Sequence, residues 1–202
     1  MSNVKQDGDA VALNATDELL GPTLARGRSD DIAILFGDKS ITFGELETQA
    51  SRFGNALTRY LGFQDRALLL LKDSPDLVAA YLGIMRIGAV SVALSTRSSA
   101  HDLAFAIADS GAKALLIDDE FLPLYQQVTG LTPHPPEFVA VRGAPDGGFP
   151  TIEELLAGAS AQKPQVVTRS TDMAFWLYTS GTTGTPKAAV HCHGDVIVGD
   201  SY

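Results

Sequence analysis

The chain has 202 residues, of which 45% are hydrophobic and 19% are charged, and its formal net charge at pH 7 is −9. This much apolar material can bury a core, which excludes disorder as a general description of the chain. The acidic balance, with no run of Lys and Arg, argues against a nucleic-acid-binding surface and against a general attraction to anionic membranes.

Cysteine content and the N-terminal residues indicate the compartment. A single cysteine, Cys192, excludes an internal disulfide framework and a thiolate zinc cluster. Residues 1–9 are polar and no apolar segment follows them, so no signal peptide is expected. The longest aliphatic run, residues 67–71, is too short to span a bilayer. These features predict a soluble, cytoplasmic protein.

Residues 1–30 are predicted as a polar lead-in. Within them, residues 16–20 favour a short helix that ends at Gly21 and Pro22, because both residues interrupt helices.

A hairpin and a helix are predicted next. Two apolar runs, residues 32–36 and 40–43, are joined by a Gly-Asp-Lys turn, which is typical of a β-hairpin. Thr42 and Glu45 have the spacing of a capping box, so a helix begins here. Its apolar face consists of Leu46, Ala50, Phe53, Leu57 and Leu61.

From residue 66 onwards, strand and helix patterns alternate. Apolar runs predict strands at residues 67–71, 89–94, 114–117 and 138–141. Helices are predicted between them: one capped by Ser74 with Pro75 in its first turn, one capped by Ser98 or Ser99, and a short one at residues 121–128. Repeated strand–helix–strand units favour an α/β fold with a doubly wound, mostly parallel sheet flanked by helices.

The sequence pattern changes after residue 141. Thr151 and Glu154 form another capping box, for a short helix. Residues 158–171 are predicted as a polar linker, and residues 173–178 as a strand. The predicted organisation is therefore a lead-in over residues 1–30, an α/β subdomain over 31–172, and a strand, loop and start of a further subdomain over 173–202.

The most informative segment is residues 179–187, Thr-Ser-Gly-Thr-Thr-Gly-Thr-Pro-Lys. Its glycines allow a tight turn that presents backbone N–H groups, and the hydroxyls and Lys187 add donors that can surround a polyphosphate. In a Walker P-loop the lysine directly follows glycine. Because Pro186 precedes the lysine here, a P-loop NTPase is disfavoured and a phosphate-binding loop of another type is expected.

Residues 179–187 resemble the phosphate loop of the adenylate-forming superfamily, which includes acyl-CoA synthetases, luciferases and peptide-synthetase adenylation domains. Residues 41–46 and 81–90 also resemble segments of this superfamily, namely an early helix start and a helix–Gly–Ala–strand unit. The stretch over residues 174–193 is similar to benzoate and related aryl-CoA ligases.

The resemblance implies that the loop binds ATP. It assigns the β- and γ-phosphates to Thr182, Thr183 and Lys187, and the shape and backbone donors of the loop to other members of the segment. The complete predicted ATP-binding set is Thr179, Ser180, Gly181, Thr182, Thr183, Gly184, Thr185 and Lys187.

The resemblance further implies a two-step ligation. A carboxylate attacks the α-phosphorus of ATP and pyrophosphate leaves, after which the thiol of coenzyme A displaces AMP. Relatives are much longer, so the catalytic residues and the ligands of the implied Mg²⁺ are expected after Tyr202. The sequence therefore predicts an N-terminal fragment of an ATP-dependent acyl- or aryl-CoA ligase, incomplete as a catalyst, with ATP, an aromatic acid and coenzyme A as partners.

Two alternatives remain open from the sequence. One is an adenylation domain that loads a carrier protein, and the other is a short, non-catalytic protein that binds nucleotide or a partner. For a fragment, the helix that begins near Asp195 is expected to be cut short, and surfaces meant for a following subdomain are expected to be exposed and to favour self-association.

Four further features suggest chemistry but have simpler explanations. His191 and His193 alternate along a strand, so they do not converge on a metal; a substrate-side or loop-supporting role for His193 is the functional alternative. Phe175 and Trp176 could line an aryl pocket, but core packing is preferred. Residues 118–120 are predicted as a solvated helix start, and Cys192 has no visible base partner.

Overall fold

A six-stranded sheet forms the centre of the structure, a computed structural model that describes residues 10–144, 148–179 and 186–198. The strand order is β6-β5-β3-β4-β7-β8. The first five strands in this order are parallel, and β8 runs antiparallel to β7. The strands are β3 (Arg66–Leu70), β4 (Val90–Ala93), β5 (Ala114–Asp118), β6 (Phe138–Arg142), β7 (Met173–Thr179) and β8 (Lys187–Cys192).

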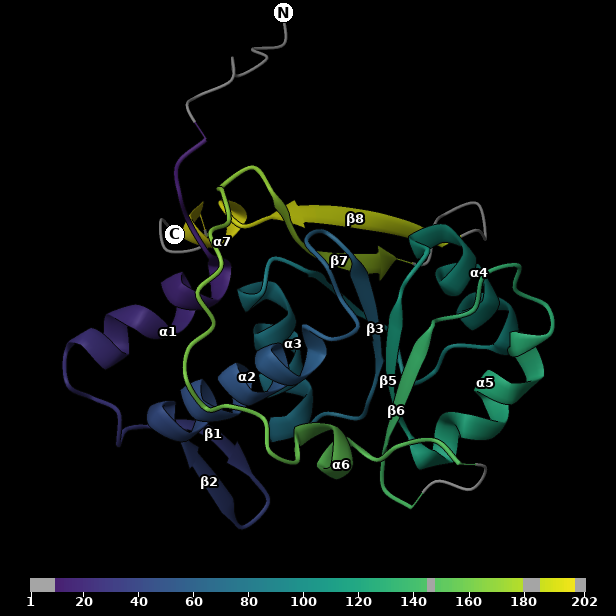
Figure 1. The fold of residues 1–202 in the computed structure, drawn as a ribbon, viewed down its shortest axis with the longest axis horizontal. Coiled ribbons are helices and arrows are strands. Elements are labelled where there is room, and N and C mark those ends of the chain that lie inside the picture. The colour runs from purple at the N-terminus through teal and green to yellow at the C-terminus, as the bar shows by residue number, and fades with distance from the viewer. Residues whose placement is uncertain (1–9, 145–147, 180–185, 199–202) are drawn as a thin grey trace, which may run out of the picture.

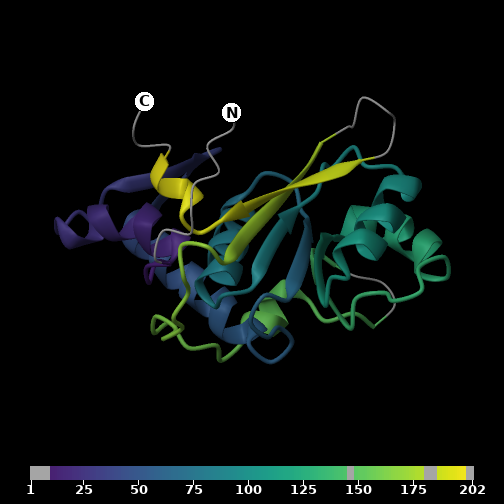
Figure 2. The ribbon, with the colours of Figure 1, turned by 90° about the horizontal axis from the view of Figure 1, so that it is seen from above.

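Helices cover both faces of this sheet (Figures 1 and 2). On one face lie α2 (Phe43–Leu57) and α3 (Pro75–Arg86), and on the other lie α4 (Ala100–Ser110) and α5 (Leu122–Thr129). Successive residues of β3 alternate between the two: Leu69 packs in the cluster with α2 and α3, whereas Leu68 and Leu70 pack in the cluster with α4 and α5. The predicted doubly wound, mostly parallel sheet is confirmed.

The helix boundaries follow the local signals. Capping boxes are present at α2, at α4 and at the short helix α6 (Ile152–Leu156), where a hydroxyl residue and an acid three positions later exchange hydrogen bonds with each other's backbone N–H. The left-handed conformation of Gly111, φ 54°, ends α4, because glycine adopts it without steric cost. Of the two serines predicted to cap α4, Ser99 is the cap.

The first helix is longer than predicted. α1 (Ala15–Ala25) continues through Gly21 and Pro22, where the sequence indicated an end. A proline inside a helix costs about 3 kcal/mol because it removes one backbone donor and crowds the preceding turn. Leu20 is buried and Leu24 packs against the core, and burying a leucine contributes about 1.5–3 kcal/mol. The packing of leucines before and after the exposed Pro22 therefore outweighs the local signal for a helix end at Gly21 and Pro22.

The predicted hairpin is also confirmed. β1 (Ile32–Phe36) and β2 (Lys39–Thr42) pair antiparallel and form a separate two-stranded sheet. Ile34 and Ile41 of this hairpin pack against the cluster that contains α2 and α3. The hairpin therefore extends the layer of α2 rather than the main sheet.

The predicted lead-in (residues 1–30) and the predicted polar linker (residues 158–171) lie side by side where they meet. The N–H of Leu13 donates to the carbonyl of Thr168 over 2.9 Å, and the N–H of Ser170 donates to the carbonyl of Val11 over the same distance. The Asn14 amide donates to the Thr168 hydroxyl and to the carbonyls of Met85 and Arg86. These bonds fix α1 to the end of α3. The predicted domain boundaries at residues 30 and 172 stay a prediction.

Short elements complete the description. A 3-10 turn, η1 (Asp119–Phe121), joins β5 to α5, and α7 (Asp195–Val198) follows β8. Among the helices that the structure describes, none is long and apolar enough to cross a membrane.

Candidate functional site

The end of the β7–β8 hairpin carries the described part of the predicted phosphate loop. Thr179 is the last residue of β7, and it pairs with Lys187, the first residue of β8. The Thr179 hydroxyl lies 3.4 Å from the carbonyl oxygen of Lys187, and both residues are exposed. Because β7 runs parallel to β4, this end lies at the carboxyl edge of the sheet, where open α/β sheets bind ligands.

The remainder of the predicted loop lies outside the described residues. This applies to Ser180, Gly181, Thr182, Thr183, Gly184 and Thr185. The structure therefore places the two ends of the predicted ATP-binding segment opposite each other at the carboxyl edge, and the phosphate contacts themselves stay a prediction.

A cavity of about 200 Å³ adjoins this end of the hairpin. Tyr178, Thr179 and Pro186 form one wall, and the connection from β4 into α4 forms the other, with Ser95, Arg97, Ser98 and Asp102 among its residues. The sequence predicted Ser98 only as a helix cap. Its place beside the hairpin depends on β4 and β7 being neighbours in the sheet, a pairing of strands more than 80 residues apart that no local pattern indicates.

Tyr178 connects the hairpin to α4. Its hydroxyl donates a hydrogen bond of 2.8 Å to a carboxylate oxygen of Asp109, and its ring packs edge-on against Phe105, with ring centres 6.3 Å apart. Burial of the ring, together with the bond to the Asp109 carboxylate, raises the pKa of the Tyr178 phenol. The phenol therefore stays protonated and acts as a donor. Sequence reasoning did not single out this residue.

His193 is buried at the other end of the hairpin. Its side chain is fully inaccessible, and its Nδ1 accepts a 2.9 Å hydrogen bond from the N–H of Ala15 at the start of α1. Burial lowers the pKa of His193, although the carboxylates of Asp172 and Asp17 oppose this effect. Neutral His193 thus links β8 to α1; the predicted substrate-side role is not tested by this contact.

The two histidines do not form a metal site. His191 stacks on Phe175, with ring centres 4.6 Å apart, and its Nδ1 lies 3.5 Å from a carboxylate oxygen of Asp195. Within the described residues, no group of three His, Cys, Asp or Glu side chains is placed to hold a metal ion. No Mg²⁺ ligand is therefore assigned here.

Core packing explains the two aromatic residues of β7. Phe175 packs with the cluster around α2 and α3, and Trp176 packs with the cluster around α4 and α5. The Trp176 indole N–H is buried and has no hydrogen-bond partner in the described part of the chain. Burial also raises the pKa of the Cys192 thiol, which disfavours the thiolate.

Asp118 is the one acid of residues 118–120 for which the solvated prediction is wrong. Its side chain is only 6% exposed, and its two oxygens accept hydrogen bonds of 2.6 and 2.7 Å from Arg142. It also accepts a 2.8 Å bond from the backbone N–H of Lys72. The residue lies at the end of a central strand, where three strand ends converge, so the carboxylate joins β3, β5 and β6.

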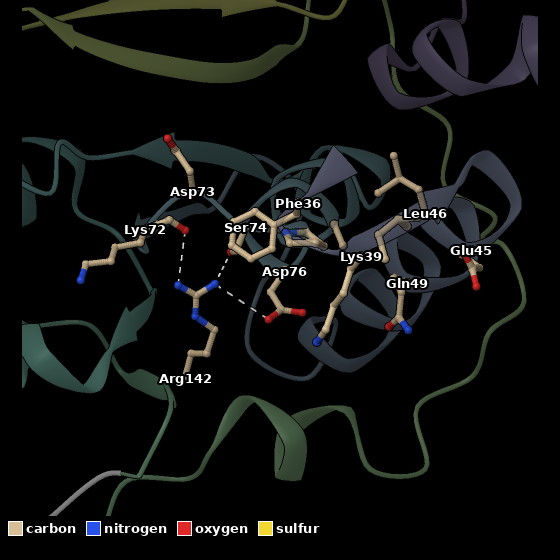
Figure 3. A pocket seen from close by; sticks show the side chains of 13 residues that line it. Phe36, Lys39, Glu45, Leu46, Gln49, Lys72, Asp73, Ser74, Asp76 and Arg142 are labelled. Atoms are coloured by element: carbon tan, nitrogen blue, oxygen red, sulfur yellow. Dashed lines mark hydrogen bonds and ion pairs between the residues drawn. The ribbon is translucent and has the colours of Figure 1, made fainter. Parts of the chain in front are cut away.

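A cavity of about 480 Å³ lies beside the Arg142 of this ion pair (Figure 3). It is bounded by the β1–β2 hairpin, α2, the first turn of α3 and Arg142. Besides Asp118, Arg142 donates to the hydroxyl of Ser74 and to the carbonyl of Lys72, so most of its donors are engaged by the protein itself. Arg142 therefore forms part of the wall of this cavity.

Comparison with known proteins extends these observations. The family of AMP-binding enzymes matches residues 23–200. The chain is 45% identical over 190 residues to a 3-hydroxybenzoate–CoA ligase of Aromatoleum sp. (strain CIB), and 46% identical over 192 residues to a 3-hydroxybenzoate–CoA/4-hydroxybenzoate–CoA ligase of Thauera aromatica. Each alignment covers 94% of this chain, and the chain spans 36% of the length of each relative.

Solved structures are similar in fold. The crystal structure of an anthranilate CoA ligase in complex with anthranoyl-AMP superposes with a TM-score of 0.85 at 28% identity, over 91% of this chain and 35% of that one. The match of the family to residues 23–200 includes the hairpin end with Thr179 and Lys187. The chain therefore belongs to the family of AMP-binding enzymes.

Proposed function

We propose that this chain is the ATP-phosphate-binding part of an aryl-CoA ligase, which activates an aromatic carboxylic acid as its adenylate and transfers it to coenzyme A. The observation that carries the proposal is the hairpin end, with Thr179 opposite Lys187 at the carboxyl edge of a parallel sheet. It is supported by the 45–46% identity to two hydroxybenzoate–CoA ligases. Because the chain spans 36% of those relatives, the complete activity is proposed for the protein that contains this chain.

The proposed chemistry has two steps. A carboxylate oxygen attacks the α-phosphorus of ATP, the bond to the β-phosphate oxygen breaks, and pyrophosphate leaves. The thiol sulfur of coenzyme A then attacks the acyl carbon, AMP leaves, and the thiol proton is released. Negative charge develops on the departing pyrophosphate in the first step, so donors positioned there stabilise the transition state.

Roles are proposed for the residues of the segment. Lys187, with Thr182 and Thr183, would bind the β- and γ-phosphates. Thr179 would begin the loop at the strand end. Ser180, Gly181, Gly184 and Thr185 would complete the loop with hydroxyl and backbone donors. Mg²⁺ would neutralise phosphate charge, with ligands from other parts of the protein. A cytoplasmic location remains part of the proposal.

The test uses the protein expressed from the complete reading frame that contains this chain. We expect exchange of labelled pyrophosphate into ATP that depends on an aromatic acid, with benzoate, 3-hydroxybenzoate, 2-aminobenzoate, phenylacetate and a fatty acid compared. Formation of the acyl thioester should then require coenzyme A. Lys187→Ala should slow exchange by about 100-fold or more, the usual cost of removing a group that stabilises developing charge. Lys113→Ala, in an exposed ion pair with Glu137, is the matched control.

Two results would contradict the proposal. Absence of exchange with every acid would contradict adenylation itself. Exchange followed by transfer to a carrier protein, and not to coenzyme A, would retain adenylation and replace the acceptor.

A further inference from the structure

We infer that Tyr178 and Asp109 form a positioning pair that holds the phosphate-binding end of the β7–β8 hairpin against α4. Neither residue is a proposed ligand of ATP, and the inference rests on the proposed function of this hairpin end. It concerns only described residues: the pair itself and the neighbouring Thr179 and Lys187.

Tyr178 lies directly beside the phosphate-binding end of the β7–β8 hairpin. It is the residue before Thr179, and it pairs with Ala188, the residue after Lys187, across the two strands. Its side chain forms part of the wall of the 200 Å³ cavity beside Thr179 and Pro186. The contacts of this side chain therefore hold the strand from which the predicted phosphate ligands begin.

The contacts of Tyr178 run along one face of α4. Its ring lies edge-on against Phe105, and its hydroxyl reaches Asp109, one helical turn further along. Residues four apart on a helix share a face, so both contacts are made by the same side of α4. The 2.8 Å bond joins the hydroxyl to an exposed carboxylate oxygen of Asp109.

The place of Asp109 in α4 is otherwise unfavourable. It lies in the last turn of the helix, which has no basic residue, and a negative charge there opposes the partial negative charge of the helix C-terminus. The Tyr178 hydroxyl is the hydrogen-bond donor that the structure shows for this carboxylate. Acceptance of this bond accounts for an acid at a position where helix electrostatics disfavours it.

The positioning role predicts an effect on phosphate binding with the fold intact. We expect Tyr178→Phe, which keeps the ring and removes the hydroxyl, to weaken binding of ATP and of inorganic tripolyphosphate by about two- to tenfold, the range of one hydrogen bond's net contribution. Asp109→Ala should have the same effect, and the double variant should lose no more than either single variant, because they remove one shared interaction. Asp109→Asn keeps an acceptor oxygen and should recover part of the affinity.

The experiment is carried out on the 202-residue chain. Binding is followed by the fluorescence of Trp176, the single tryptophan of the sequence, which lies two residues before Tyr178. Amide hydrogen exchange of residues 187–190 is measured without ligand, and the thermal midpoint is measured alongside. Tyr60→Phe is the matched control, since Tyr60 is exposed at one edge and stacks on Phe138, far from this hairpin end in sequence and contacts.

The outcomes separate the inference from the proposed function. Weaker ATP binding and faster amide hydrogen exchange at residues 187–190 in Tyr178→Phe and Asp109→Ala, with Tyr60→Phe like the wild type, support the pair. Unchanged ATP affinity and unchanged amide hydrogen exchange in those variants overturn the inference, and they leave the proposed function intact if Lys187→Ala slows pyrophosphate exchange as expected. Failure of the wild-type chain to bind either ligand overturns the proposed function of this chain. If amide hydrogen exchange is then also unchanged in Tyr178→Phe and Asp109→Ala, the anchoring is overturned as well.

Discussion

Arg142 at the end of β6 and Asp118 at the end of β5 form a two-pronged ion pair, with N–O distances of 2.6 and 2.7 Å, whose carboxylate is almost completely buried. The same carboxylate accepts the N–H of Lys72 after β3. Three neighbouring strands are thus joined at one edge. Arg142 of this pair also lines the cavity of about 480 Å³ shown in Figure 3.

Asp118→Ala should destabilise the protein strongly. The substitution leaves the Arg142 charge without its partner and the Lys72 N–H without an acceptor, and breaking a buried pair in this way costs about 3 kcal/mol or more. Chemical denaturation with urea measures the loss. Glu137→Gln, which breaks the exposed pair with Lys113, should leave the unfolding midpoint unchanged. Equal effects of the two substitutions would contradict a structural role for Asp118.

The stability of the folded chain should decrease on acidification because of His193. Burial holds the pKa of His193 below its value in the unfolded chain, about 6.5, so the unfolded state takes up a proton more readily than the folded state. The contribution of His193 is therefore complete above about pH 6.5 and decreases as the pH falls through that value. Protonation also removes the lone pair that accepts the Ala15 N–H.

The check is urea denaturation of the wild type and of His193→Gln between pH 5 and pH 7.5. The wild type should lose more stability on acidification than the variant, whose side chain does not titrate. His101→Gln, at a side chain that is 80% exposed, is the control and should keep the wild-type dependence. Parallel pH dependences in the wild type and His193→Gln would refute the assignment.

Two glycines should respond in opposite directions to alanine. A Cβ on Gly83 of α3 would lie 2.5 Å from the carbonyl oxygen of Ala50 and 2.8 Å from the nitrogen of Gly54, both in α2. The helices would have to separate, and overpacking of this kind costs about 1–3 kcal/mol. A Cβ on Gly21 of α1 would meet no atom of the described residues within 4 Å, so Gly21→Ala should stabilise by about 0.5–1 kcal/mol. Thermal unfolding of both variants tests the close approach of α2 and α3.

Self-association is predicted through β8. It is the last strand in the order of the described sheet, and its Val190 is 48% exposed, features that favour pairing with another chain. Sedimentation velocity of the 202-residue chain should show a concentration-dependent increase in mass, which Val190→Lys should reduce. Val167→Lys, at a valine that is 78% exposed outside the strands, is the control and should not change it. A monomer at all concentrations would contradict the prediction.

The sequence by itself determined the local structure and the chemical character of the loop. Capping boxes and apolar runs act within a few residues, so the helix starts at Thr42 with Glu45 and at Thr151 with Glu154 could be predicted directly. The hydroxyl-rich segment that ends at Lys187 likewise carries its chemistry in adjacent residues. The alternation of strands and helices was enough to predict a doubly wound sheet.

Tertiary structure alone decided which distant residues meet. Tyr178 and Asp109 are 69 positions apart, and His193 and Ala15 are 178 apart. Asp118 reads as a solvated acid because its burial depends on Arg142 from a neighbouring strand, and α1 continues through Pro22 because the core packs on both sides of it. Such contacts depend on strand order and on helix packing, which no local pattern encodes. The chemistry of the phosphate segment is therefore local, whereas the anchoring of its two strands is a property of the whole fold.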